Sequence, residues 1–265
     1  MNLSDLNKNL SLTVTAVIIA VAMIICTLIA SDAVNNFTKS KNNITVTGAA
    51  KKQITSDLIV WKGVFSVQSA QLPEAYTKLS QDLGKIKSYL GQKGIPEKDI
   101  VVSSINTMEI RRNPEKSMSP YDYEIMLKKL GASGMASNIV EGYRLTQSVE
   151  IKSGDVDKIE GISRSSTELI NQGVQFQSEP PRYFYTKLND LKIDMLAEAS
   201  KDARRRAEML VENSGSKIGG LRSSKMGVFQ ITQPFSNEVS DYGINDTSSK
   251  EKEITSVVNA EFFVK

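Results

Sequence analysis

The chain lacks histidine altogether and has one cysteine, Cys26, among its 265 residues. Without histidine there is no Ser-His-Asp or Cys-His catalysis and no imidazole metal ligand. Cys26 lies within an apolar run, so the rest of the chain has no thiol nucleophile, disulfide or cysteine-ligated zinc. Any reaction would have to use carboxylates, Lys, Arg, Tyr, Ser and Thr. We therefore expect a protein that is not an enzyme, with no cofactor and no metal site.

A strong net charge is also absent. The 33 Lys and Arg residues against 30 Asp and Glu residues leave a formal charge of +3. Domains that bind nucleic acid usually show a clear basic excess, with a pI above about 9, so no nucleic-acid partner is expected. The hydrophobic fraction of 40% is enough for a packed core. The length allows one large domain or two small ones.

The longest apolar run is Leu12–Ala30, which contains no charged residue. A helix of this length spans close to the ~30 Å hydrocarbon core of a membrane. We predict a transmembrane signal-anchor here, preceded by a short head at residues 1–11 and followed by a polar tether at 31–43. Two alternatives stay open: a signal peptide cleaved after Ala33, with Ser31 as the other small residue of the site, or a buried core helix.

The remainder, residues 44–265, predicts a mixed α+β domain exported beyond the membrane. Strands are expected over residues 44–49, 58–67, 100–110, 142–151, 174–177, 221–232 and 254–264. Helices are expected over residues 71–93, 155–171 and 188–213, the last being long and rich in alanine. The order strand, helix, glycine, strand occurs twice, which indicates two β-α-β-like units. Residues 111–141 predict a long excursion, and residues 237–253 predict a polar, acidic loop.

Several segments resemble the SIMPL domain family. They are ITVTGAAKK from Ile44, LGQKGIPEKDI, YRLTQSVEIKSGDVDKI, and ASKDARRRAEMLVENSGSKIGGL, which places Ala199, Ala203, Arg204, Ala207, Gly215 and Gly219 at matching positions. The resemblance covers about residues 44–265, and it is the order and spacing of the segments that make it specific. The sequence departs from the family pattern in the longer 111–141 stretch and in the acidic loop after Phe235.

The resemblance implies a bacterial cell-envelope protein of the kind loosely described as oxidative-stress-defence or immunogenic periplasmic proteins. It implies no established enzymatic activity, and at least one member is thought to build a ring-like homo-oligomer. Combined with the apolar run, it leads us to expect a single-pass inner-membrane protein with its C-terminal domain in the periplasm. The alternative is a protein secreted to the periplasm after signal cleavage.

Two groups of residues are candidate subunit contacts in the folded domain. Arg204, Arg205 and Arg206 fan over about 200° of a helix and cannot form one clamp, so they are either solvated charges or interface arginines. The segment from Glu179 contains Arg182, Tyr183, Phe184 and Tyr185, which either pack locally or contact a second subunit. The glycines from Gly215 to Gly220 follow a helix rather than precede one, so they indicate a helix stop and not a phosphate loop.

Within the excursion, Tyr121 and Tyr123 complete the set of candidate interface residues. Our main hypothesis is a non-enzymatic, membrane-anchored envelope protein that self-assembles and serves in scaffolding or stress protection. The assembly would use sheet edges, the Tyr183–Tyr185 region and the excursion. The alternative is a binding or adaptor module for a protein, peptide or glycan, with other envelope proteins among its partners. An enzyme is the third hypothesis.

Overall fold

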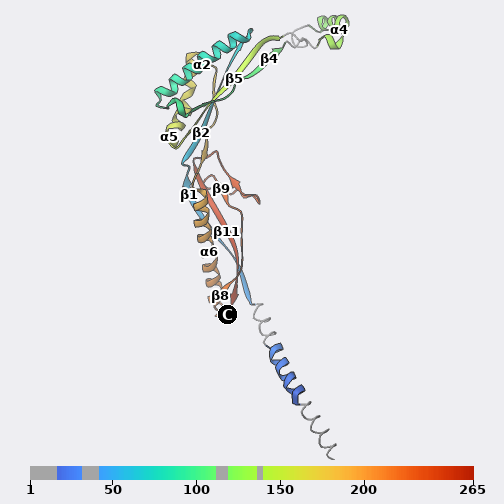
Figure 1. The fold of residues 1–265 in the computed structure, drawn as a ribbon, viewed down its shortest axis with the longest axis vertical. Helices are drawn as coiled ribbons and strands as arrows, with labels where there is room; N and C mark the ends of the chain where they lie inside the picture. Colours follow the sequence, from blue (N-terminus) through green and yellow to red (C-terminus); the bar gives the residue numbers. More distant parts are fainter. Residues whose placement is uncertain (1–16, 32–41, 112–118, 136–139) are drawn as a thin grey trace, which may run out of the picture.

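The computed structural model describes residues 17–31, 42–111, 119–135 and 140–265. In this part of the chain two β-sheets each carry helices, which confirms the α+β class (Figure 1). The strands are β1 (Asn43–Thr55), β2 (Leu58–Ser69), β3 (Ile100–Val102), β4 (Asn106–Arg111), β5 (Val140–Ser153), β6 (Phe176–Ser178), β7 (Arg182–Phe184), β8 (Ile218–Met226), β9 (Gln230–Thr232), β10 (Ile244–Asn245) and β11 (Glu251–Val264). The helices are α2 (Leu72–Gln92), η1 (Glu97–Asp99), α4 (Pro120–Met135), α5 (Val156–Ser165), η2 (Ser166–Gln172) and α6 (Leu188–Glu212).

The first sheet, called sheet A here, has the strand order β1-β11-β9-β10, and β8 also pairs with β11. The two long strands β1 and β11 are antiparallel in an unbroken register from Asn43↔Phe263 to Thr55↔Glu251. The strand predicted over residues 44–49 therefore continues to Thr55. Lys51 and Gln53 interrupt its apolar alternation, but they face Thr255 and Glu253 of β11, which keep the strand extended.

Helix α6 packs closely on sheet A through small residues. Ala199, Ala203 and Ala207 are fully buried against β1 and β11. A Cβ atom on Gly48 of β1 would lie 2.2 Å from the Ala199 carbonyl oxygen, so helix and strand backbones touch at this point. The predicted apolar face of the helix is confirmed except at its end, where Val211 is buried and Leu210 is exposed.

The second sheet, sheet B, has the order β3-β5-β2-β6, with β4 also paired to β5 and β7 also paired to β2. The units β2-α2-β3 and β5-α5-β6 interlock, because one strand of each lies between the two strands of the other. This is the split β-α-β arrangement of ferredoxin-like folds. The two β-α-β-like units predicted from the sequence are present.

The helix predicted over residues 71–93 is confirmed as α2, whereas the helix predicted over residues 155–171 is divided into α5, which ends at Ser165, and the 3-10 helix η2, which continues to Gln172. Pro73 lies in the first turn of α2, and Gly94 follows its end with φ +76°. The Asp155 carboxylate accepts a hydrogen bond of 3.2 Å from the Lys158 amide and caps α5. The core beneath contains Trp61, whose indole N–H donates to Ser178 Oγ at 2.9 Å.

Two predicted strands are divided in the structure. The strand over residues 100–110 separates into β3 and β4. Between them the Ser103 amide still donates to the Ser148 carbonyl at 2.9 Å, but the Ser148 amide donates to the Ser103 hydroxyl at 3.0 Å instead of to a backbone carbonyl. The strand over 221–232 separates into β8 and β9. The predicted excursion contains α4, while its residues 112–118 and 136–139 lie outside the described part of the chain.

The prediction of a membrane-spanning helix over Leu12–Ala30 is wrong, and with it the single-pass inner-membrane location. Within the described residues, no helix is both long and apolar enough to cross a membrane. Residues 17–31 are the part of this region that the structure describes, and they are helical. Residues 1–16 and 32–41, which include the predicted head and most of the tether, lie outside the described part.

Candidate functional site

The most densely bonded polar region lies where sheets A and B meet. The chain passes from β1 to β2 through Ser56 and Asp57, and the Ser56 amide donates to the Lys250 carbonyl at 2.9 Å. Both carboxylate oxygens of Asp57 are used, one by the Thr186 amide at 2.7 Å and one by the Thr186 hydroxyl at 2.8 Å. The Tyr183 amide donates to the Thr247 carbonyl at 2.8 Å. Backbone and side-chain bonds together fix the approach of the two sheets.

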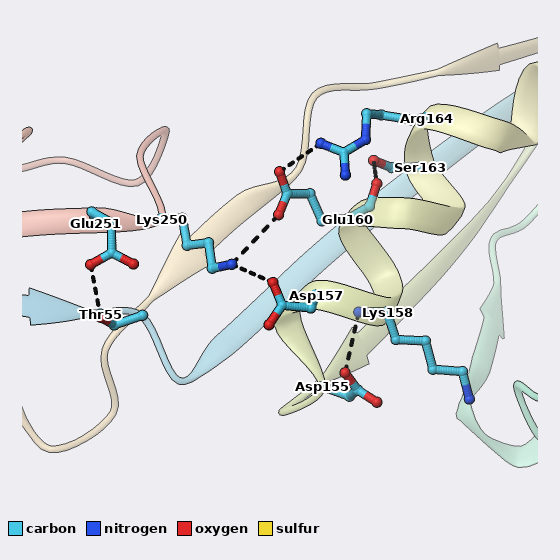
Figure 2. A network of polar contacts seen from close by, with 9 residues as sticks. All are labelled: Thr55, Asp155, Asp157, Lys158, Glu160, Ser163, Arg164, Lys250 and Glu251. Carbon is cyan, nitrogen blue, oxygen red and sulfur yellow. Dashed lines mark hydrogen bonds and ion pairs between the residues drawn. The ribbon is translucent and has the colours of Figure 1, made fainter.

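An ionic contact crosses the same junction (Figure 2). Lys250, just before β11, donates to the Asp157 carboxylate and lies 3.8 Å from Glu160 Oε2. Glu160 also receives Arg164 Nη1 at 3.0 Å. The hydrogen bond to Asp157 raises the pKa of Lys250, since it favours the charged ammonium. The loop that starts β11 is thereby tied to α5 of sheet B.

A buried lysine lies on the sheet A side of the junction. Lys252 is 2% exposed, donates to the Asp246 carbonyl and has its Nζ 3.9 Å from Asp246 Oδ2. Burial lowers the pKa of Lys252, and the Asp246 charge opposes that effect. Burial alone would raise the pKa of Asp246, but hydrogen bonds from Ser248 and Ser249 outweigh it and lower the pKa.

The second candidate region is a groove beside the free edge of β1, called the α6–β1 groove. It has a volume of about 450 Å³. Its lining residues come from two elements: Ala49, Ala50, Lys51 and Lys52 from β1, and Met195, Glu198, Lys201, Asp202 and Arg205 from α6. The Ala49 amide donates to Asp202 Oδ2 at 2.9 Å, and this hydrogen bond is the largest cause of a lowered pKa of Asp202.

The predicted contact residues on β7 are divided between core and surface. Tyr183 is buried at 8% exposure, and burial raises the pKa of its phenol, with the Glu160 charge acting in the same direction. Arg182 is exposed and its guanidinium carbon lies 6.0 Å from the centre of the Phe184 ring. Tyr185 packs against the apolar cluster beneath the start of α6. In this segment Arg182 is exposed and lies 4.0 Å from Glu150, Phe184 is half-buried, and Tyr183 belongs to the core.

The predicted arginines lie on one helix but in different surroundings. Arg204 is paired with Glu208 at 2.9 Å, and Arg206 with Asp202 at 2.8 Å. Arg205 is exposed and lines the α6–β1 groove. Arg205 therefore lines a groove together with residues of β1, whereas its two neighbours form ion pairs along α6.

The predicted tyrosines of the excursion lie on α4. Tyr121 is 73% exposed and Tyr123 is half-buried. The eight predicted contact residues are therefore carried by α4, the β7 region and α6, and they do not form one cluster. Among the described residues there is no group of three or more acidic or thiol side chains arranged to hold a metal ion.

These observations define the class of the molecule as a two-sheet α+β protein with a split β-α-β half and a half covered by one alanine-rich helix. The chain belongs to the SIMPL family, described as a protein of unknown function (DUF541), whose family model matches residues 44–262. This confirms the resemblance predicted from the motifs. A search of curated proteins finds no match.

Sequence reasoning missed two cations that the fold makes prominent. Lys52 lines the groove beside Arg205, although 153 positions separate the two in the sequence. Lys250 joins the two halves of the molecule but was part of a segment expected to be a solvated loop. The sequence did contain one useful signal for the groove. The spacing of Ala199, Ala203 and Ala207 indicates that the helix packs closely on a sheet. Charged residues next to these alanines then lie at the edge of the helix–sheet contact.

Proposed function

We propose that this protein is a non-enzymatic scaffold that assembles with copies of itself. The observation that carries the proposal is the unpaired edge of β1. This strand has 13 residues and pairs with β11 alone among the described strands. Open edges of this length are templates for association, and proteins that stay monomeric usually shorten or cover them. Here the cover is a single side chain, because Asp202 reaches the amide of Ala49.

Exposed apolar side chains at sheet edges support the same proposal. Leu221 and Met226 of β8 are 56% and 51% exposed, and Met108 of β4 is 58% exposed. These side chains lie on two different sheets, so they mark separate edges rather than one patch. In this chain they lie on strands that each have a free side, where a second copy gains both backbone hydrogen bonds and apolar contact.

The non-enzymatic part of the proposal rests on residue types and on their present partners. The carboxylates at the sheet junction are engaged, Asp57 by Thr186 and Asp157 by Lys250. With no histidine in the chain, a general base would have to come from such carboxylates or from a lysine.

Light scattering coupled to size-exclusion chromatography on the full chain tests the proposal. We expect a mass that is a multiple of the 29.2 kDa chain and a distribution that shifts with dilution. A monomer at every concentration up to about 100 µM would contradict self-assembly, because weaker association has little meaning for a scaffold.

Helix α4 favours a second candidate function, a binding module for a protein, peptide or glycan. Tyr121, Ile125 and Leu127 on this helix are 73%, 48% and 39% exposed. Deleting residues 113–138 separates the two functions. Loss of the oligomer in the deletion variant supports assembly through the excursion. An unchanged oligomer together with a loss of partner capture supports the binding module.

A further inference from the structure

The free edge of β1 presents backbone groups toward the α6–β1 groove. The Ala49 amide leaves the sheet on that side, since it bonds to Asp202 rather than to β11. In an antiparallel pair, backbone groups alternate between the two sides of the strand. Because the register of β1 with β11 is unbroken, Lys51 and Gln53 also direct their amide and carbonyl groups outward.

The α6–β1 groove holds two cations that form no salt bridge within the described residues. Lys51 is paired with Glu253 at 2.9 Å, and Lys201 with Glu198 at 2.8 Å. Lys52 and Arg205 are exposed and form no salt bridge with any residue of the described ranges. Met209, one turn beyond Arg205, is 58% exposed and lines the adjoining hollow with it. The groove is therefore basic, and Met209 gives it an apolar extension along α6, in a hollow that Glu208, Glu212 and Lys217 also line.

At the other edge of sheet A, residues 233–243 form a loop between β9 and β10, called the β9–β10 arm (Figure 1). Three of its large apolar side chains are almost fully exposed: Phe235 at 88%, Val239 at 82% and Tyr242 at 98%. Its two acids, Glu238 and Asp241, are exposed and form no salt bridge within the described part of the chain. The arm therefore has an apolar and acidic surface.

The arm has a fixed shape before it meets a partner. The side-chain amide of Gln230 on β9 donates to the Ser240 carbonyl at 2.7 Å and accepts the Ser240 amide at 3.4 Å. The Gly243 amide closes a turn on the same carbonyl at 3.1 Å. A preformed loop loses little conformational entropy on docking, which favours association.

We propose that the β9–β10 arm of one copy docks in the α6–β1 groove of a second copy, with Glu238 and Asp241 against Lys52 and Arg205. Two unpaired acids three positions apart meet two unpaired cations, and Val239 and Tyr242 meet the apolar extension at Met209. The strand order β1-β11-β9-β10 puts groove and arm at opposite edges of one sheet. An arm therefore cannot reach its own groove, and the contact is head-to-tail.

This inference rests on the proposed self-assembly and names the contact through which the copies associate. Each docked copy leaves one free arm and one free groove, so association continues until a ring closes or a filament forms. The contact between two copies uses different surfaces on each, which distinguishes it from a two-fold dimer.

Charge exchange in the full chain tests the contact. The arm variant is Glu238→Lys/Asp241→Lys, and the groove variant is Lys52→Glu/Arg205→Glu. Each variant alone faces like charges at every contact, so we expect association at least about tenfold weaker than in the unmodified chain. In an equimolar mixture the reversed arm meets the reversed groove and the native arm meets the native groove. We expect the mixture to recover the mass of the unmodified oligomer by light scattering.

Matched control variants have the same change in net charge as the arm and groove variants, but their substitutions lie in the half of the molecule that contains sheet B. Asp99→Lys/Glu168→Lys is the control for the arm, and Lys78→Glu/Lys98→Glu is the control for the groove; all four side chains are exposed and form no salt bridge within the described residues. Both controls should assemble like the unmodified chain. Circular dichroism on every variant verifies that it is folded.

The outcomes separate this inference from the proposed function. If the unmodified chain assembles and the arm and groove variants assemble equally well, the arm–groove contact is overturned and self-assembly stands. Failure of the mixture to recover the oligomer also overturns the contact. If the unmodified chain is itself a monomer up to about 100 µM, both the proposed function and the inference fail.

Discussion

The backbone amide of Ala49 donates a hydrogen bond of 2.9 Å to Asp202 Oδ2 and joins the free edge of β1 to the middle of α6. The same carboxylate oxygen accepts Arg206 Nε at 2.8 Å. One acid therefore protects a single amide of a strand edge that otherwise lies open, and it also forms part of the wall of the α6–β1 groove. Because its two partners act through the ionised form, its contribution to stability depends on pH.

Replacing Asp202 with Asn tests this contact. The Ala49 hydrogen bond lowers the pKa of Asp202, partial burial opposes that shift, and Arg206 adds to it. A lowered pKa means that the contribution is fully present above the unfolded pKa and is lost as pH falls through the folded pKa. We expect Asp202→Asn to lower the free energy of unfolding by about 1 kcal/mol at neutral pH, and the difference to shrink below about pH 4. Urea unfolding of both chains across this range measures it. A difference independent of pH would contradict the ionised contact.

Gly48 provides a test of how closely α6 approaches β1. A Cβ at this position would lie 2.2 Å from the Ala199 carbonyl oxygen and 2.3 Å from the Ala203 amide nitrogen. Because both atoms belong to the helix backbone, α6 would have to move, and we expect Gly48→Ala to cost about 3 kcal/mol or more. The control is Gly84→Ala on α2, where no atom lies within 4 Å and alanine favours the helix. Thermal unfolding should show opposite shifts for the two variants, and equal shifts would contradict the packing.

The pairing of Lys252 with Asp246 predicts that replacing both residues lowers the stability less than replacing Lys252 alone. Lys252→Met leaves the Asp246 carboxylate, whose side chain is 14% exposed, without its cation. Breaking a buried pair in this way costs about 3 kcal/mol, whereas neutralising both partners costs little. We therefore expect Lys252→Met/Asp246→Asn to recover most of the stability that Lys252→Met loses. Urea unfolding measures both, and additive losses would show that the two charges do not interact.

Local features of the sequence predicted most helix starts and ends, because the residues that start or stop a helix interact with close neighbours in the sequence. Gly215 follows α6 with φ +74°, as predicted for a helix stop, and Gly94 follows α2 in the same way with φ +76°. Asp155 caps α5 by binding an amide three residues ahead. In each case the physical cause acts within one helical turn and can be seen in a short stretch of sequence.

Features that depend on distant partners were predicted less well. The end of β1 was placed too early because the apolar alternation stops before Lys51, whereas Lys51 pairs with Glu253 across the sheet. The α6–β1 groove escaped prediction for the same reason, since Lys52 and Arg205 come together only when α6 lies on β1. Apolar content over Leu12–Ala30 predicted a membrane span, which no helix of the described residues bears out.

The last prediction concerns the coupling of the two sheets through Lys250. The chain has one tryptophan, Trp61, fully buried in the core beside sheet B, so its fluorescence follows that half alone. Far-UV circular dichroism follows both halves. In the unmodified chain we expect the two signals to change together during urea unfolding. Lys250→Ala removes the ammonium that binds Asp157 and Glu160, and we expect the two transitions to separate.

A matched variant and a salt titration make this prediction specific. Lys62→Ala removes an ion pair with Glu179 at 3.8 Å that lies beside sheet B alone, so its two transitions should stay together. Salt at about 1 M screens exposed charges. In the unmodified chain it should therefore separate the fluorescence and circular dichroism transitions in part, by less than Lys250→Ala separates them. If the two signals still coincide in Lys250→Ala, the backbone bonds from Ser56 to Lys250 and from Tyr183 to Thr247 suffice to couple the halves. The ionic contact would then have no part in holding the two sheets together.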